Sequence, residues 1–227
     1  MTSTARIDTP PRTAAARLRI NEIFYSLQGE ARTVGCPTVF VRLTGCPLRC
    51  GWCDTEYAFT EGAWMALDEI VTRVAEYAPR FVTVTGGEPL AQPACRELMQ
   101  RLCERGYSVS IETSGAFDVS NIDPRVSIVM DLKAPGSGEE AKNRYENIGL
   151  LAHKDQVKFV LADRADYEWS RAKLTEYRLD QRCEVLFSPV HGQLNPTELA
   201  EWILADRLPV RMQIQLHKYL WQDARGR

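Results

Sequence analysis

Short apolar runs that alternate with helical patterns constrain the fold of this chain more than any other feature. Where strands and helices alternate repeatedly, the strands form a mainly parallel sheet with helices outside it and right-handed crossovers. We therefore expect an α/β fold. The expected strands are 20–28, 38–43, 80–87, 107–115, 127–133, 156–162, 184–190 and 210–216, and the expected helices are 66–78, 94–106, 164–178 and 196–205.

Glycine-rich and polar segments follow several of the expected strands. They read TGCPLRC, TGGEP, ETSG, DLKAP and FSPV along the sequence. Because parallel strands point the same way, their carboxyl ends meet at one rim, and in parallel barrels that rim holds the active site. The sequence therefore predicts a functional site built from these segments.

The composition narrows the classes of function. The formal net charge is −2, which argues against direct binding of nucleic acid or of a membrane surface. No apolar run approaches the roughly 20 residues that span a bilayer, and the N-terminal segment lacks the apolar core of a secretory signal. We expect residues 1–17 to be a disordered leader and residues 18–227 to form a single domain in the reducing cytoplasm.

Three cysteines lie close together in the segment GCPLRCGWC: Cys46, Cys50 and Cys53. The glycines and the proline around them favour a turning backbone that brings the thiols together. A structural zinc site takes four ligands, and Cys36 would become the fourth only if the intervening strand doubled back. A 4Fe-4S cluster normally takes four thiolates, so three cysteines leave one iron open to a substrate or cofactor. The loop therefore favours a catalytic iron–sulfur cluster.

The segment CPLRCGWC resembles the C-x3-C-x2-C signature of the radical S-adenosylmethionine superfamily. The resemblance implies that the three cysteines hold a 4Fe-4S cluster and that S-adenosylmethionine chelates the open iron. In that superfamily the reduced cluster cleaves the sulfonium and generates a 5'-deoxyadenosyl radical, which abstracts hydrogen from the substrate. Trp52, before the last cysteine, is typical of the signature and is expected to help hold the adenine.

Later rim segments resemble the cofactor-binding motifs of the same superfamily. The segment TGGEP (85–89) resembles the motif that receives the methionyl amino group, and paired glycines and an acidic side chain suit that task. The segments ETSG, DLKAPGSG and FSPV resemble the elements that contact the ribose, a carboxylate and the adenine. The resulting expected contacts of S-adenosylmethionine are Trp52, Cys53, Asp54, Gly87, Glu88, Ser114, Asp131, Lys133, Ser188, Pro189, Val190 and His191.

Further segments resemble the 7-carboxy-7-deazaguanine synthase family, from about residue 20 to 221. They are EIFYSLQGE (22–30), FVRLTGC (40–46), CDTEYAF (53–59) and IQLHKYLW (214–221), together with the rim motifs. This resemblance implies a partial (β/α)6-type TIM barrel with its active site at the C-terminal rim. It also implies ring contraction of 6-carboxy-5,6,7,8-tetrahydropterin to 7-carboxy-7-deazaguanine with loss of ammonia, supported by magnesium. A homodimer and a flavodoxin- or ferredoxin-type electron donor are further expectations from the family.

The family pattern assigns substrate roles to residues in these segments. Thr55 is expected to give its hydroxyl to Mg²⁺, which takes few protein ligands. Arg42 is expected to face a carboxylate, and His217, at the end of an expected strand, to bond the substrate. The full expected substrate set is Leu27, Gln28, Gly29, Glu30, Arg42, Thr85 and His217.

Two alternatives share part of this pattern. An activase that makes a glycyl radical on a partner protein has the cysteine loop and TGGEP, but it needs neither LQGE nor Thr55. A non-catalytic scaffold would hold tetrahedral zinc with Cys36 as the fourth ligand. Turnover of a pterin separates the first alternative from our interpretation, and the identity of the bound metal separates the second.

Overall fold

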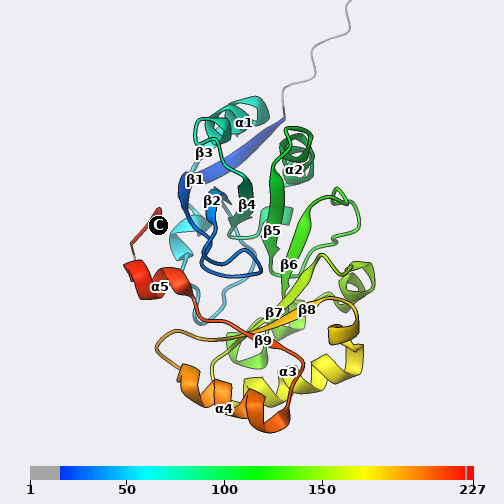
Figure 1. The fold of residues 1–227 in the computed structure, drawn as a ribbon. Coiled ribbons are helices and arrows are strands. Elements are labelled where there is room, and N and C mark those ends of the chain that lie inside the picture. Colours follow the sequence, from blue (N-terminus) through cyan, green and yellow to red (C-terminus); the bar gives the residue numbers. More distant parts are fainter. Residues whose placement is uncertain (1–15, 223) are drawn as a thin grey trace, which may run out of the picture.

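A computed structural model describes residues 16–222 and 224–227, and it confirms an α/β fold around one nine-stranded sheet (Figure 1). The strand order is β3-β1-β2-β4-β5-β6-β7-β8-β9. Every pairing from β2 to β9 is parallel, and β1 pairs antiparallel with both β2 and β3. The strands are β1 (Arg17–Leu27), β2 (Pro37–Leu43), β3 (Ala63–Ala66), β4 (Phe81–Gly86), β5 (Ser108–Thr113), β6 (Ser127–Asp131), β7 (Gln156–Leu161), β8 (Glu184–Pro189) and β9 (Arg211–Met212).

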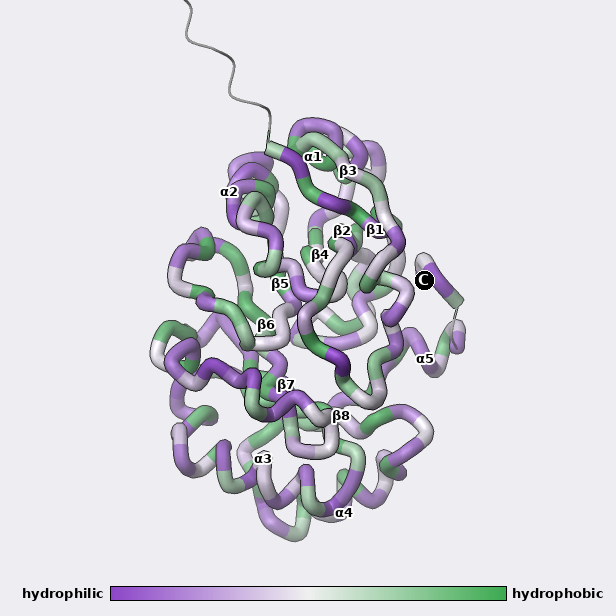
Figure 2. The backbone as a smooth tube through the Cα atoms, turned by 180° about the vertical axis from the view of Figure 1, so that it is seen from behind, coloured by the Kyte–Doolittle hydropathy of each residue, from purple (hydrophilic) through white to green (hydrophobic). Residues whose placement is uncertain are grey.

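The α-helices lie outside the curved sheet, with α1 and α2 along its first strands and α3 and α4 along its last (Figure 1). In α1 the buried residues Leu67, Ile70, Val71 and Val74 recur at helical spacing, so one face joins the core. Purple and green alternate along α3 and α4, as expected of helices with one buried face (Figure 2). The helices are α1 (Leu67–Ala75), α2 (Cys95–Glu104), α3 (Arg164–Tyr177), α4 (Pro196–Asp206) and α5 (Leu216–Trp221).

The barrel is partial because the sheet ends at β3 and β9, which do not pair with each other. The loop after β1 bridges part of the gap. The Ala31 amide donates to Gln213 Oε1 at 2.9 Å, and the Arg32 amide donates to Gln156 Oε1 at 3.0 Å. The Leu216 amide donates to the carbonyl of Gly29 at 3.0 Å. This loop therefore carries the LQGE segment across the interior of the sheet.

Each expected strand and helix corresponds to an element of the structure, with two differences. The strand expected at 210–216 is wrong beyond Arg211–Met212, because the chain turns away after β9 to form α5. The strand β3 was not expected. No helix was expected in the crossovers β5–β6 and β6–β7, which are formed by bends, turns and 3₁₀ turns.

The expected leader overlaps the described residues only at its end. Arg17 opens β1 and pairs with Ala66 of β3, so the sheet begins one residue before the expected domain start. The rest of the expected leader, residues 1–15, lies outside the described residues. Within the described ranges, no helix has the length and apolar character needed to cross a membrane.

Candidate active site

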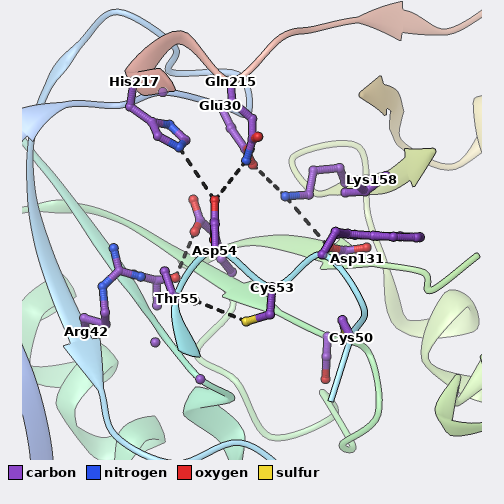
Figure 3. Close-up of a pocket in the computed structure, with 18 of the residues that line it drawn as sticks. Glu30, Arg42, Cys50, Cys53, Asp54, Thr55, Asp131, Lys158, Gln215 and His217 are labelled. Atoms are coloured by element: carbon purple, nitrogen blue, oxygen red, sulfur yellow. Dashed lines mark hydrogen bonds and ion pairs between the residues drawn. The ribbon is translucent and has the colours of Figure 1, made fainter. Parts of the chain in front are cut away.

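A cavity of about 510 Å³ opens where the parallel strands end (Figure 3). Segments far apart in sequence contribute to it, among them the cysteine loop, the LQGE segment and the start of α5. All the expected site residues line this cavity except Glu88, Ser188 and Pro189. The structure therefore brings the expected cluster, cofactor and substrate positions together at one place.

The cysteine loop lies between β2 and β3, and Cys46, Cys50 and Cys53 are each half-buried against the cavity. Burial raises the pKa of the Cys46 and Cys50 thiols, and the charge of Lys133 acts in the opposite direction on both. Within the described ranges, no three His, Cys, Asp or Glu side chains converge closely enough to hold a single metal ion. A cubane cluster does not need that convergence, since each thiolate binds a different iron. Three thiols on one cavity wall therefore suit a cluster.

The backbone that follows β4 holds the start of the cysteine loop. The Gly87 amide donates to the Leu43 carbonyl at 3.1 Å, and the Glu88 amide donates to the Gly45 carbonyl at 2.8 Å. A Cβ on Gly87 would lie 2.3 Å from the Gly45 oxygen and 2.8 Å from Cys46 Cβ. Glycine is therefore required here by close packing against the loop, besides any approach to a ligand.

A second support comes from the crossover between β6 and β7. Glu139 Oε1 accepts the Arg49 amide at 2.6 Å, and the Ser137 carbonyl accepts the Gly51 amide at 3.1 Å. These two amides flank Cys50. The crossover thus fixes the backbone on both sides of the middle cysteine.

Glu88 lies beneath the rim, with its side chain fully buried. Its carboxylate accepts hydrogen bonds from the Leu90 amide at 2.9 Å, from Thr113 Oγ1 at 2.8 Å and from the Ser114 amide at 2.7 Å. In this arrangement Glu88 joins the end of β4 to the end of β5. Its expected contact with the methionyl amino group stays a prediction.

The residues at the end of β8 and just after it differ in whether they reach the cavity. Ser188 and Pro189 are buried and do not line the cavity, whereas Val190 and His191 after them do. Asp131 bonds Lys133 Nζ through Oδ2 at 2.9 Å, and its Oδ1 is buried without a hydrogen-bond partner among the described residues. An unpartnered buried acceptor calls for a ligand donor, and a ribose hydroxyl is one. The residues present therefore fit S-adenosylmethionine.

The floor of the cavity is a network of polar side chains. Gln28 Nε2 donates to Glu112 Oε1 at 3.2 Å, and Thr85 Oγ1 donates to Glu112 Oε2 at 2.9 Å. Glu30 accepts from Lys158 Nζ at 2.6 Å. Burial alone would lower the pKa of Lys158, but the charge of Glu30 and of other nearby carboxylates outweighs it and raises that pKa. Lys158 therefore stays charged inside the cavity.

A second polar group beside this floor is built around Asp54. Gln215 Nε2 donates to Asp54 Oδ2 at 3.2 Å, and His217 Nε2 lies 3.9 Å from the same oxygen (Figure 3). Burial opposes ionisation of Asp54, but His217 and the charge of Lys218 outweigh it and lower its pKa to about 2. His217 lies on α5 and not at a strand end, so that expectation is corrected, although the residue does reach the cavity.

Gly29 and Thr55 occupy tight positions beside these groups. A Cβ on Gly29 would lie 2.2 Å from His217 Nδ1. The histidine can therefore occupy its position only because residue 29 is a glycine. Thr55 Oγ1 lies 3.8 Å from Cys53 Sγ and lines the cavity. Its hydroxyl is thus next to the thiol of Cys53, the last cysteine of the loop.

The cavity is also lined by residues that the sequence did not predict, among them Glu112, Lys158 and Gln215. Glu112 belongs to the quoted segment ETSG, and a charged residue opening a rim motif is a usable signal. Lys158 lies between the buried residues Val157 and Phe159, where a charge requires a partner. No such signal marks Gln215, because the turn that places it is set by contacts distant in sequence.

Comparisons with known proteins agree with this geometry. Residues 40–134 match the model of the Radical SAM superfamily. The 7-carboxy-7-deazaguanine synthase of Chlorobaculum tepidum is 47% identical over 93% of this chain and 98% of the relative. That of Koribacter versatilis is 44% identical over 90% of this chain and 97% of the relative. The crystal structure of QueE from Escherichia coli superposes with a TM-score of 0.73 at 24% identity, covering 88% of this chain and 94% of that one, which shows a shared fold.

The fold, the three-cysteine loop and the family match together define a radical S-adenosylmethionine enzyme. Such an enzyme requires a 4Fe-4S cluster and S-adenosylmethionine. Within this superfamily, the near-full-length similarity places the chain in the 7-carboxy-7-deazaguanine synthase family.

Proposed function

We propose that the chain converts 6-carboxy-5,6,7,8-tetrahydropterin to 7-carboxy-7-deazaguanine with loss of ammonia, as a carbon–nitrogen lyase. The product belongs to the biosynthesis of deazapurines such as queuosine, a modified nucleoside of transfer RNA. The observation that carries the proposal is the single cavity, which holds the three cysteines together with the polar floor and Arg42. When bound, the cluster and S-adenosylmethionine would supply a 5'-deoxyadenosyl radical, which abstracts a hydrogen atom from the substrate and later returns it.

The side chains of the cavity suit a bicyclic substrate with one carboxylate. Gln28 and Glu30 offer donors and acceptors to the amide-like edge of a pterin. Arg42 offers a guanidinium to the carboxylate. Thr85 and His217 border the same space, and Leu27 and Gly29 give it an apolar and a close backbone surface. These residues would bind and orient the pterin while excluding water from it.

We propose further that Thr55 helps to hold Mg²⁺ against the substrate carboxylate. A hydroxyl beside the substrate is a suitable ligand, since Mg²⁺ keeps several waters and takes few protein groups. The substitution Thr55→Ala should weaken the magnesium dependence of product formation and leave S-adenosylmethionine cleavage intact. An unchanged magnesium titration would remove Thr55 from the site.

The remaining proposals concern the setting of the enzyme. Reduction of the cluster requires a low-potential donor, so we propose a flavodoxin or ferredoxin as partner. A homodimer in the cytoplasm is proposed from the family resemblance. Neither a nucleic acid nor a membrane is proposed as a direct partner, in accord with the net charge of −2.

The test is an anaerobic assay of the reconstituted protein with dithionite, S-adenosylmethionine, magnesium and 6-carboxytetrahydropterin. We expect 7-carboxy-7-deazaguanine by mass spectrometry without net loss of S-adenosylmethionine. Cleavage to 5'-deoxyadenosine without that product would reject the substrate and keep the radical chemistry, as for a glycyl-radical activase. Zinc at full occupancy in anaerobically prepared protein, measured by X-ray absorption, would instead indicate the non-catalytic scaffold.

A further inference from the structure

Arg42 is held from behind by an acidic residue of the neighbouring strand. Its Nε donates to Glu22 Oε1 at 2.7 Å, and the two residues face each other in the β1–β2 pairing. The side chains of Arg42 and Glu22 are only 14% and 21% exposed, so water screens the pair little. The contact is therefore a shielded, charge-assisted hydrogen bond and not a surface ion pair.

Tyr57 completes this support. Its hydroxyl donates to the same oxygen, Glu22 Oε1, at 2.9 Å. The guanidinium carbon of Arg42 lies 5.9 Å from the Tyr57 ring centre and 5.7 Å from that of Phe24. Burial raises the pKa of Tyr57 to about 12, so its hydroxyl keeps its proton at neutral pH. Two aromatic rings and one carboxylate thus fix the guanidinium.

The opposite edge of that guanidinium is open to the cavity. Within residues 16–222 and 224–227, Glu22 is the only hydrogen-bonding or ion-pairing partner of Arg42, and it uses Nε. Both Nη groups therefore retain donors that match a carboxylate in a two-pronged contact. Figure 3 shows Arg42 extending from β2 toward the cavity wall that carries Thr55 and Cys53.

Glu22 and Tyr57 do not themselves line the cavity. Tyr57 is covered on its other side by Arg225, whose guanidinium carbon lies 3.9 Å from the ring centre and whose Nη1 pairs with Glu61 at 3.1 Å. The contacts of Glu22 and Tyr57 described above connect both residues to the cavity through Arg42.

We propose that Glu22 and Tyr57 are positioning residues that hold Arg42 by its Nε and aim its Nη groups at the substrate carboxylate. The inference rests on the proposed function, because it takes the pterin carboxylate as the group that Arg42 meets. Under this proposal Glu22 and Tyr57 support substrate binding indirectly, without contacting the substrate themselves. It also predicts that their effect is specific for a ligand that carries the carboxylate.

Binding of two fluorescent pteridines tests the inference without turnover. The probes are 6-carboxypterin, which keeps the carboxylate, and pterin, which lacks it, each titrated into protein loaded with cluster and S-adenosylmethionine. We expect Glu22→Ala to weaken 6-carboxypterin binding on the order of tenfold, as expected when a charged hydrogen-bond partner is lost. Pterin binding should change less than about twofold, because the lost interaction does not reach that ligand. Glu22→Gln should restore most of the affinity, since its amide oxygen still accepts from Nε.

A double-mutant cycle separates positioning from a general structural role. In an Arg42→Ala background, Glu22→Ala should cause no further loss of 6-carboxypterin binding, because its route to the ligand is gone. Tyr57→Phe should cause a loss smaller than that of Glu22→Ala. The control is Glu97→Ala, which removes an exposed ion pair with Arg101 on α2 and should leave binding of both pteridines unchanged.

Three results would overturn the inference: equal affinities of parent and Glu22→Ala, equal losses for the two pteridines, or losses that add in the Arg42→Ala background. Iron content and thermal unfolding are measured for each variant, and Glu22→Gln and Tyr57→Phe carry the test if Glu22→Ala does not fold. A parent that binds neither pteridine and makes no deazaguanine rejects the proposed function. A parent that prefers 6-carboxypterin while Glu22→Ala keeps that preference rejects the positioning role alone.

Discussion

The floor of the cavity and the cysteine loop are held in place by different kinds of contact. On the floor, polar side chains pair with one another: Gln28 donates a hydrogen bond to Glu112, and Lys158 forms an ion pair with Glu30. In the loop, burial of the Cys46 and Cys50 thiols disfavours the thiolates that a metal requires, and close backbone contacts carry much of the geometry. The floor is therefore organised by contacts between side chains, whereas the loop is organised mainly by contacts of its backbone.

This difference predicts where substitutions act. Changes on the floor should affect folding first, because they leave buried charges without partners. Changes in the loop should affect cluster content first, because the fold does not depend on the thiols. Four substitutions test the comparison.

The largest effect is expected from Cys50→Ala. Without this ligand the cluster should not remain bound, so the iron content and all product formation should be lost while the protein still folds. Iron analysis, absorbance of the cluster and circular dichroism measure the three quantities. The matched control is Cys36→Ala, since Cys36 is also half-buried but does not line the cavity. Turnover by Cys50→Ala, or loss of the cluster in Cys36→Ala, would contradict the assignment.

The sequence predicted the loop and most of the rim because both are local signals. Spacing of Cys46, Cys50 and Cys53 and glycines after apolar runs can be read from a few neighbouring residues. The parallel sheet follows from the alternation of these apolar runs with helical patterns.

The floor was harder to predict because its partners are distant along the chain. Lys158 and Glu30 come from β7 and the loop after β1, and neither segment alone reveals the other. The prediction of a strand at 210–216 was wrong beyond β9 for a related reason. The alternation in IQL after residue 213 suggests a strand, but the bond from the Leu216 amide to the Gly29 carbonyl turns the chain into α5.

The second prediction concerns the floor. Lys158→Met should leave Glu30 in a largely shielded site without its partner, lowering the free energy of unfolding by about 3 kcal/mol. The double variant Glu30→Gln with Lys158→Met should recover part of that loss. Denaturant unfolding of the anaerobic protein gives both values.

The control for this prediction is Arg101→Met on the exposed side of α2, which removes ion pairs with Asp68 and Glu97. Exposed pairs of this kind contribute less than about 1 kcal/mol. If Lys158→Met and Arg101→Met had equal effects, the floor would not be the preorganised region that the comparison describes.

The third prediction contrasts two glycines that border the cysteine loop. A Cβ on Gly87 would lie 2.3 Å from the Gly45 carbonyl oxygen, whereas a Cβ on Gly51 would meet nothing nearer than 3.9 Å. Gly87→Ala should therefore strain the loop by about 1–3 kcal/mol and lower the iron bound after reconstitution. Gly51→Ala should bind iron as the parent does. Equal iron content in the two variants would show that the loop yields easily and is not fixed by its backbone contacts.

The smallest effect is expected from Glu139→Ala in the crossover between β6 and β7. This change removes the acceptor of the Arg49 amide beside Cys50, but the bond from the Gly51 amide to the Ser137 carbonyl remains. The loop should keep its cluster and lose it to a chelator only about two- to fivefold faster, consistent with the net value of one partly exposed hydrogen bond. Lys142→Ala, an exposed change in the same crossover, should leave the rate unchanged. A rate for Glu139→Ala equal to that control would mean that the Ser137 contact alone fixes the backbone around Cys50, and complete loss of the cluster would mean that the crossover is as necessary as a ligand.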